Sequence, residues 1–414
     1  MKTIIKHTLL LLILAILSTG INAQKKPELA SSPPMGWNSW NWHGKPEINE
    51  KVVMQTIDAM VYGGLLDAGY NYLVIDGGWR DTKLGPKGEL LAHPQKFPGG
   101  IKMLADYAHS RGMKLGVHVV PGTHDCGGDP VGGFNREEIH VNQFVEWELD
   151  FIKLDLCTQK EDPCEACQKT RGGWSETAIE DSYRKWSRLL NQCERDILFS
   201  ISAYQYRNWY PEVCNMARTT GDIQSRIHKG GAMFNPPEGT EMVHYSVMDI
   251  AESNNISAEH AGNGYWNDPD MLVTGEHGMT EAEQESHFAL WCIMSSPLIL
   301  GNDPRSMTEF EKELILNEEM IAVNQDPTEQ GKLVKSVDNT QVWIKNLQDG
   351  KKAVLLLNLD TTGKRDIQVK LNEIGFKGEV TARDLIGKKD LGSFNGSISL
   401  SAETNQCHFL LLAD

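Results

Sequence analysis

The chain has 414 residues, and its 56 acidic and 40 basic side chains give a formal net charge of −16. This balance argues against nucleic acid and anionic membranes as partners, because phosphate groups are bound by clustered lysine and arginine. The length is too great for one typical small domain, but it fits a large α/β barrel with an appended module.

The N-terminus, MKTIIKHTLLLLILAILSTGINAQ, has the pattern of a secretory signal peptide. Lys2 and Lys6 precede an apolar run over residues 9–17, and small and polar residues follow. The run is short for a membrane span. We therefore expect residues 1–23 to be cleaved and the mature protein to be exported, as a secreted or periplasmic protein.

Short apolar segments alternate with longer amphipathic segments from residue 33 to about 305. This alternation predicts parallel strands with helical crossovers, and eight strands are the number in a (β/α)8 TIM barrel. We assign residues 24–329 to this catalytic barrel. The expected strands are 35–40, 72–79, 114–122, 151–157, 197–204, 217–223, 265–272 and 297–302.

The pattern changes after NQDP, near residue 326. TQVWIKNLQDGKKAVLLLNLDTTG reads as two strands around the Asp349-Gly350 turn, and short strands without a convincing helix follow. Residues 330–414 are therefore expected to form a small C-terminal antiparallel β-sandwich. Nothing in it suggests catalysis.

The expected barrel strands end in polar motifs such as IDGGW, KLDLC, SISAY, RTTGD and WNDPD. In barrel enzymes this end of the strands is the active-site face. In FIKLDLC, Lys153 and Asp155 project from the same face of an apolar strand. Burying both charges is costly, so their presence indicates a shared polar cavity at the barrel mouth.

No phosphate-binding loop, HExxH motif or EF-hand is present, so no metal or cofactor is expected. The aspartates at the strand ends lie beside tryptophans, a combination that suits a carbohydrate, and two carboxylates can perform glycoside hydrolysis. Structural roles remain open for Trp37 and Trp79, which fit a core equally well. Arg218 and Asp222, four residues apart, also fit a plain surface pair.

Four of the eight cysteines lie close together in the sequence: Cys126, Cys157, Cys164 and Cys167. Two disulfides are favoured over a four-sulfur zinc site, because the first spacing is long and the chain is expected to be exported.

Several motifs, in order along residues 30–330, resemble glycoside hydrolase family 27 of clan D. This family contains retaining α-galactosidases and α-N-acetylgalactosaminidases, and the resemblance continues more weakly through the β domain. The motifs are SPPMGWNSW, DAGYNYLVID, KFPGGIKMLADYAHSRGMKLGV, FIKLDLC, RTTGD, WNDPDML and NQDP.

The resemblance implies that Asp155 is the nucleophile and Asp222 the general acid/base. It also implies a disulfide between Cys126 and Cys157 beside the nucleophile, and we expect Cys164 to pair with Cys167. Nearby Lys153 and Arg218 are expected to keep Asp155 ionised. The expected sugar-binding residues are Trp40, Asp76 (near O4 and O6), His118, Lys153, Ser202, Arg218 and Asp268.

Three departures from the family pattern affect the substrate. IDGGW has Gly77 and Gly78 where the family has an aspartate and a cysteine, and His118 replaces a common tyrosine. His118 is our candidate to replace the missing sugar contact. SISAYQY, in the loop that selects between 2-hydroxyl and 2-acetamido groups, lacks the glutamate typical of α-galactosidases.

The expected function is an exo-acting retaining α-galactosidase that releases terminal α-galactose-like residues from oligo- or polysaccharides. β-L-arabinopyranosidase and α-N-acetylgalactosaminidase are the alternatives, and a sugar-binding protein without turnover is a more remote one. The sequence leaves the natural polymer, the linkage and the oligomeric state open.

Overall fold

The computed structural model describes residues 26–161, 163–167, 172–229, 233–234, 242–243 and 245–414. The expected signal peptide therefore lies outside the described residues. Among the described residues, no helix has the length and apolar character needed to cross a bilayer.

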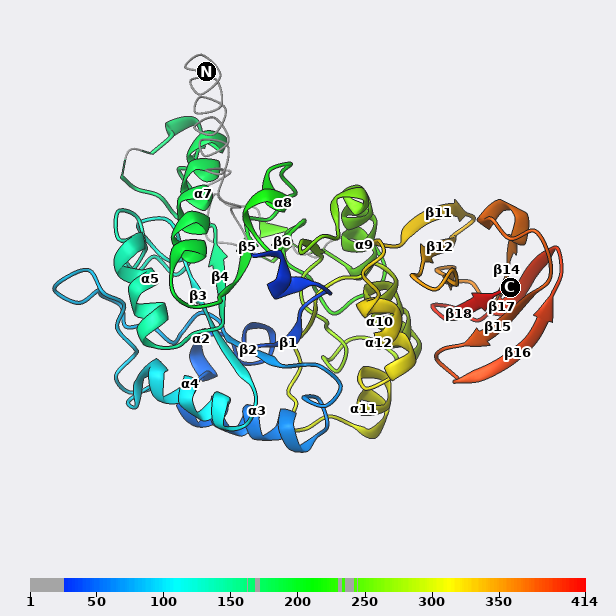
Figure 1. Cartoon of the computed structure of the whole chain (residues 1–414), viewed down its shortest axis with the longest axis horizontal. Coiled ribbons are helices and arrows are strands. Elements are labelled where there is room, and N and C mark those ends of the chain that lie inside the picture. Colours follow the sequence, from blue (N-terminus) through cyan, green and yellow to red (C-terminus); the bar gives the residue numbers. More distant parts are fainter. Residues whose placement is uncertain (1–25, 162, 168–171, 230–232, 235–241, 244) are drawn as a thin grey trace, which may run out of the picture.

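Eight parallel strands form the centre of the barrel, surrounded by helices (Figure 1). They pair in the order β10-β1-β2-β3-β4-β5-β6-β9, and a parallel bridge between Leu272 and Leu300 closes the ring. The expected TIM barrel is confirmed. The strands are β1 (Met35–Asn38), β2 (Tyr72–Ile75), β3 (Lys114–Val119), β4 (Phe151–Asp155), β5 (Leu198–Ser202), β6 (Met216–Arg218), β9 (Trp266–Asp268) and β10 (Leu298–Leu300).

All eight strands were expected, but they end earlier than the apolar patterns suggested. The segment expected at 72–79 pairs only as far as Ile75, since Gly78 has φ +104° and turns the chain. The segment expected at 217–223 ends at Arg218. The polar residues beyond these points form loops at the barrel mouth.

Several helices around the barrel begin at side-chain caps. Ser175 caps α7, and Thr280 forms a capping box with Glu283 at the start of α10. The α-helices are α2 (Trp40–Glu47), α3 (Glu50–Tyr62), α4 (Gly100–Ser110), α5 (Glu137–Glu146), α7 (Glu176–Gln192), α8 (Tyr210–Val213), α9 (Val247–Asn255), α10 (Glu281–Ile293), α11 (Glu309–Ile315) and α12 (Glu318–Gln325). Short 3-10 helices span Pro27–Ala30, Glu165–Cys167, Ala258–His260 and Leu371–Ile374, and β7 (Met233–Phe234) pairs with β8 (Met242–Val243).

The C-terminal part is antiparallel, as expected. One sheet has the order β11-β12-β13-β18-β15-β16, and β14 pairs with β17. Apolar side chains of both sheets, including Leu356 and Ile398, form one core, which makes this part a sandwich. The strands are β11 (Lys332–Val337), β12 (Thr340–Asn346), β13 (Lys352–Asn358), β14 (Arg365–Lys370), β15 (Val380–Asp384), β16 (Lys389–Phe394), β17 (Ser397–Ala402) and β18 (Cys407–Ala413).

Helix α10 lies between the barrel and the β domain (Figure 1). Its buried Trp291 belongs to the same apolar cluster as Trp343 and Phe409 of the β domain. An apolar core therefore continues across the junction, and the barrel does not present a solvent-exposed face there.

Candidate active site

A cavity of about 210 Å³ lies at the C-terminal ends of the barrel strands. It is lined by all but one of the residues that the sequence analysis proposed for catalysis and sugar binding: Trp40, Asp76, His118, Lys153, Asp155, Ser202, Arg218 and Asp222. The exception is Asp268, which ends β9 and lines a smaller adjoining cavity instead. The strand order thus gathers residues that are far apart in the sequence.

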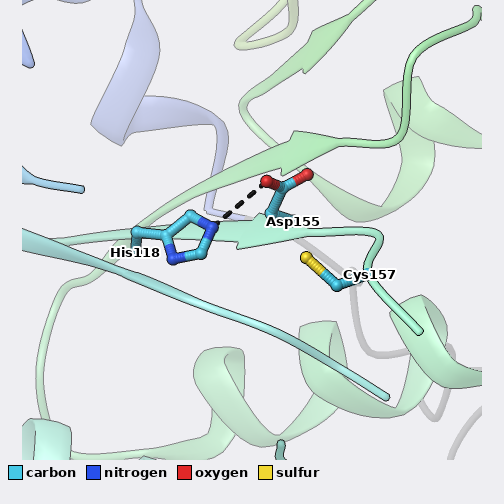
Figure 2. Close-up of side chains that lie close together, drawn as sticks. All are labelled: His118, Asp155 and Cys157. Carbon is cyan, nitrogen blue, oxygen red and sulfur yellow. Dashed lines mark hydrogen bonds and ion pairs between the residues drawn. The ribbon is translucent and has the colours of Figure 1, made fainter. Parts of the chain in front are cut away.

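Asp155 is held by hydrogen bonds to both of its carboxylate oxygens. Tyr204 Oη donates to Oδ1 at 2.6 Å. His118 Nε2 lies 3.1 Å from Oδ2, a contact that Figure 2 shows. Burial alone raises the pKa of Asp155, but the contact with His118, the charge of Lys153 and the bond from Tyr204 outweigh it and lower the pKa. Asp155 is therefore ionised at neutral pH, which the expected role of nucleophile requires.

Lys153 pairs with Asp76 rather than with Asp155. Its Nζ donates to Asp76 Oδ2 at 2.7 Å, and Asn38 Nδ2 donates to the same oxygen at 2.9 Å. Burial disfavours both charges, yet their attraction lowers the pKa of Asp76 and raises that of Lys153. The two charges that the FIKLDLC strand brings to the cavity therefore have separate partners.

Arg218 anchors the opposite side of the cavity. Its Nη2 lies 2.9 Å from Asp270 Oδ2 and 3.0 Å from Asp222 Oδ1. The Arg218 side chain is only 3% exposed, so the surface-pair interpretation is wrong, whereas the Asp222 side chain is 32% exposed and accessible from the cavity. Burial raises the pKa of Asp270 despite Arg218. Arg218 thus directly contacts Asp222 and Asp270, not Asp155.

Several residues that the sequence analysis did not assign to the site also line the cavity, among them Tyr204, Asp270 and Arg80. Tyr204 and Asp270 lie in the motifs SISAY and WNDPD, so their place after a barrel strand was an available signal. Arg80 follows IDGGW in a loop, and nothing in the local sequence distinguishes it from a surface cation.

The tryptophans separate into core and cavity residues. Trp37 and Trp79 are fully buried and donate their indole N–H groups to the backbone oxygens of Asn302 and His118, so both are core residues. Trp40 is 43% exposed and lines the cavity. A Cβ at Gly77 would lie 3.2 Å from Trp40 Cζ3, so the ring lies against this glycine.

Cys126 and Cys157 are bonded, as are Cys164 and Cys167. The first bond lies next to Asp155, and Cys126 Sγ is 3.7 Å from Asp155 Oδ2. Ligand-type atoms of His118, Asp155 and Cys157 lie within 4.8 Å of one another (Figure 2). Because this sulfur is bonded and the imidazole contacts the carboxylate, the cluster acts here as support for Asp155 rather than as a ready metal site.

Comparison with known proteins agrees with this geometry. The family model for alpha galactosidase A matches residues 32–326, and that for the alpha galactosidase C-terminal beta sandwich domain matches 337–412. Alpha-galactosidase 2 of Arabidopsis thaliana is 36% identical over 390 residues, which are 93% of this chain and 90% of that protein. An alpha-galactosidase of Cyamopsis tetragonoloba is also 36% identical, over 93% of this chain and 87% of its own length.

Solved structures share the whole architecture. Alpha-galactosidase I of Mortierella vinacea superposes with a TM-score of 0.86 at 29% identity, covering 94% of this chain and 98% of that one. Two carboxylates in a cavity at the mouth of such a barrel provide the groups that a glycoside hydrolase needs. The chain belongs to the alpha-galactosidase family, glycoside hydrolase family 27.

Proposed function

We propose that this protein is an α-galactosidase that removes terminal α-galactose residues by double displacement. The observation that carries the proposal is the ionised, doubly hydrogen-bonded Asp155, which shares a small cavity with Asp222. The alpha-galactosidases that match nearly the whole chain support the substrate class.

In the first step, Asp155 attacks the anomeric carbon while Asp222 donates a proton to the leaving oxygen. The glycosidic bond breaks, and an ester bond forms between the sugar and Asp155. In the second step, Asp222 takes a proton from water, which displaces Asp155 and restores the enzyme. Two inversions retain the α configuration in the product.

The cavity volume supports action at chain ends. At about 210 Å³, it is smaller than the roughly 300–1,000 Å³ typical of sites for drug-sized ligands. It therefore admits one sugar ring, and the rest of a polysaccharide stays outside. Asp76 and Lys153 line the cavity, and in this proposal they hydrogen-bond hydroxyl groups of that ring.

We also propose that the protein works outside the cytoplasm. The support is the signal-peptide pattern of residues 1–23 and the disulfide beside Asp155, which suits an oxidising compartment. N-terminal sequencing of the protein from the periplasm or medium tests this. A mature chain starting near Gln24 supports export, and an intact leader on protein confined to the cytoplasm contradicts it.

Hydrolysis of three p-nitrophenyl glycosides tests the substrate. The panel contains the α-galactoside, the β-L-arabinopyranoside and the α-N-acetylgalactosaminide, so it also tests both alternative activities. We expect the highest kcat/KM for the α-galactoside, and its loss in Asp155→Asn. Asp366→Asn, a carboxylate on β14 far from the cavity, is the matched control. Absence of turnover on all three contradicts the proposal.

A further inference from the structure

Arg80 is a buried cation on the cavity wall without a close carboxylate partner. Its Nη1 donates to the His118 backbone oxygen at 3.3 Å, and its Nη2 lies 3.4 Å from His118 Nδ1. The nearest ion pair is with Asp125, at 3.8 Å, and the buried Nε has no hydrogen-bond partner. Buried charges normally have close partners, so this arrangement is incomplete.

The other lysines and arginines that line the cavity differ from Arg80. Each has a carboxylate oxygen within 2.9 Å: Lys45 with Asp129, Lys153 with Asp76, and Arg218 with Asp270. Burial lowers the pKa of Arg80, because Asp125 and more distant carboxylates do not fully offset it. By contrast, close carboxylates raise the pKa of Lys153 and Arg218 above their ordinary values despite burial.

The Arg80 side chain itself lines the cavity, so a bound ligand can reach it. Arg80 follows β2, and Gly77 in the same loop also lines the cavity without a side chain. Asp76 is already neutralised by Lys153. In the sheet, β4 with Asp155 lies between β2 and β3 on one side and β5 on the other, and the family resemblance assigns the loop after β5 to the C2 side of the sugar. The same resemblance implies that Asp76, at the end of β2, lies near O4 and O6. The wall with Arg80 therefore faces C5 and C6.

We propose that the cavity takes a galactose-configured ring with an anionic group at C6, and that Arg80 binds this group. A uronate carboxylate and a 6-sulfate ester share the required chemistry, since both present oxyanions that accept paired N–H donors from a guanidinium. The inference rests on the proposed function, because it assumes that the ring is bound with C1 at Asp155.

Kinetics with three p-nitrophenyl α-glycosides tests the inference: the galactoside, the galacturonide and the galactoside 6-sulfate. In the wild type, the galacturonide or the galactoside 6-sulfate should have a higher kcat/KM than the neutral galactoside. Arg80→Met should lower the ratio of anionic to neutral kcat/KM by about 10- to 100-fold, the factor of one charge-assisted hydrogen bond. Arg80→Lys, which keeps the charge, should restore part of this ratio.

Lys102→Met is the matched control, because Lys102 is an exposed cation on α4 outside the cavity. In Lys102→Met, the ratio of anionic to neutral kcat/KM should equal that of the wild type. Which anionic substrate is hydrolysed distinguishes the carboxylate from the sulfate ester. Equal losses on neutral and anionic substrates in Arg80→Met would show that Arg80 acts only through His118, and would overturn the inference.

The inference and the proposed function fail in different ways. Turnover of the neutral galactoside alone overturns the inference and leaves the α-galactosidase proposal intact. If no substrate reacts, calorimetry on the wild type with galactose, galacturonate and galactose 6-sulfate decides the inference separately. The inference is supported if an anionic sugar binds the wild type more tightly than galactose does and if Arg80→Met abolishes this difference. It is overturned if neither anionic sugar binds the wild type more tightly than galactose.

Discussion

Lys153 and Asp155 show how a barrel strand can carry two opposite charges into a cavity without pairing them. The two side chains share a strand face, but Lys153 reaches Asp76 after β2, and Asp155 contacts His118 on β3 and Tyr204 after β5. Hydrogen bonds and neighbouring charges offset the desolvation of each group. Asp155 thereby keeps its charge without a direct contact to Lys153 or Arg218.

His118 should set the lower pH limit of activity. His118→Phe removes the contact with Oδ2, which helps to lower the pKa of Asp155, so that pKa should rise in the variant. Because Asp155 must be ionised to attack, the acidic limb of the kcat/KM profile should move to higher pH.

Tyr204→Phe removes the donor to the other oxygen and should shift the limb in the same direction. An acidic limb that stays in place in both variants contradicts this role for the two donors.

The folded-state pKa of Asp155 is lowered, so the contribution of its charge to stability is present above the unfolded-state pKa of 3.8. That contribution is lost as the pH falls through the folded-state pKa.

At the scale of elements, the loop after β2 explains why this chain has two glycines in IDGGW. Gly78 has φ +104°, and a Cβ there would lie 2.7 Å from the Lys45 backbone oxygen. At Gly77, the Cβ would meet only the Trp40 ring, at 3.2 Å, and that ring is partly exposed. The backbone therefore requires glycine at the second position more strictly than at the first.

The two adjacent glycines provide a matched pair of variants. Gly78→Ala should lower the free energy of unfolding by more than about 1–2 kcal/mol, since backbone strain at positive φ adds to the overlap with Lys45. Gly77→Ala should cost less, because Trp40 can shift. Urea denaturation measures both, and equal stability of the two variants would refute this account of the loop.

Glu276, in the loop after β9, contacts α2 through Asn41 Nδ2 at 2.9 Å. Burial raises its pKa from 4.5 to about 7. Between these values the folded state holds a proton that the unfolded state has released, so stability should fall as the pH rises through this window.

Glu276→Gln should remove this slope and stabilise the protein at pH 8 by up to about 3 kcal/mol. Thermal denaturation between pH 4.5 and 8 measures the effect. Glu313→Gln is the control, because Glu313 is an exposed carboxylate on α11. This variant should keep the wild-type dependence of stability on pH. A Glu276→Gln variant with an unchanged slope contradicts the prediction.

The sequence was sufficient to predict the barrel strands and their order of appearance, because each strand is an apolar segment bounded by polar motifs. It did not predict where pairing stops, as at Ile75 and Arg218, because chain turning depends on the neighbouring loops. The cavity residues came from strand-end motifs. Arg80 was missed, since its burial results from packing against β3 and not from any local pattern.

At the scale of the molecule, Lys345 links the β domain to the barrel. This buried lysine on β12 donates from Nζ to Ser295 Oγ at 2.6 Å and to the backbone oxygens of Val323 and Asp326 at 2.5 and 2.7 Å. Burial lowers the pKa of Lys345 to about 8, because the charged ammonium group loses its contact with water. Part of the stabilisation from these hydrogen bonds therefore only offsets this desolvation cost.

Lys345→Met should lower the free energy of unfolding by about 1–3 kcal/mol, because it leaves buried backbone oxygens without donors. Urea denaturation, followed by fluorescence and circular dichroism, measures the loss. Lys389→Met on the exposed surface of β16 is the control. A Lys345→Met protein as stable as the wild type would show that the link contributes nothing.

The central claim is that Asp155 forms a covalent bond to the sugar, and direct labelling tests it. A fluorinated α-galactosyl fluoride, chosen to form the intermediate faster than it is hydrolysed, is incubated with the enzyme, and the peptides are analysed by mass spectrometry. The account predicts one added glycosyl group, on Asp155 in the peptide that contains FIKLDLC. A label on Asp222, or turnover without any labelled peptide, would contradict it.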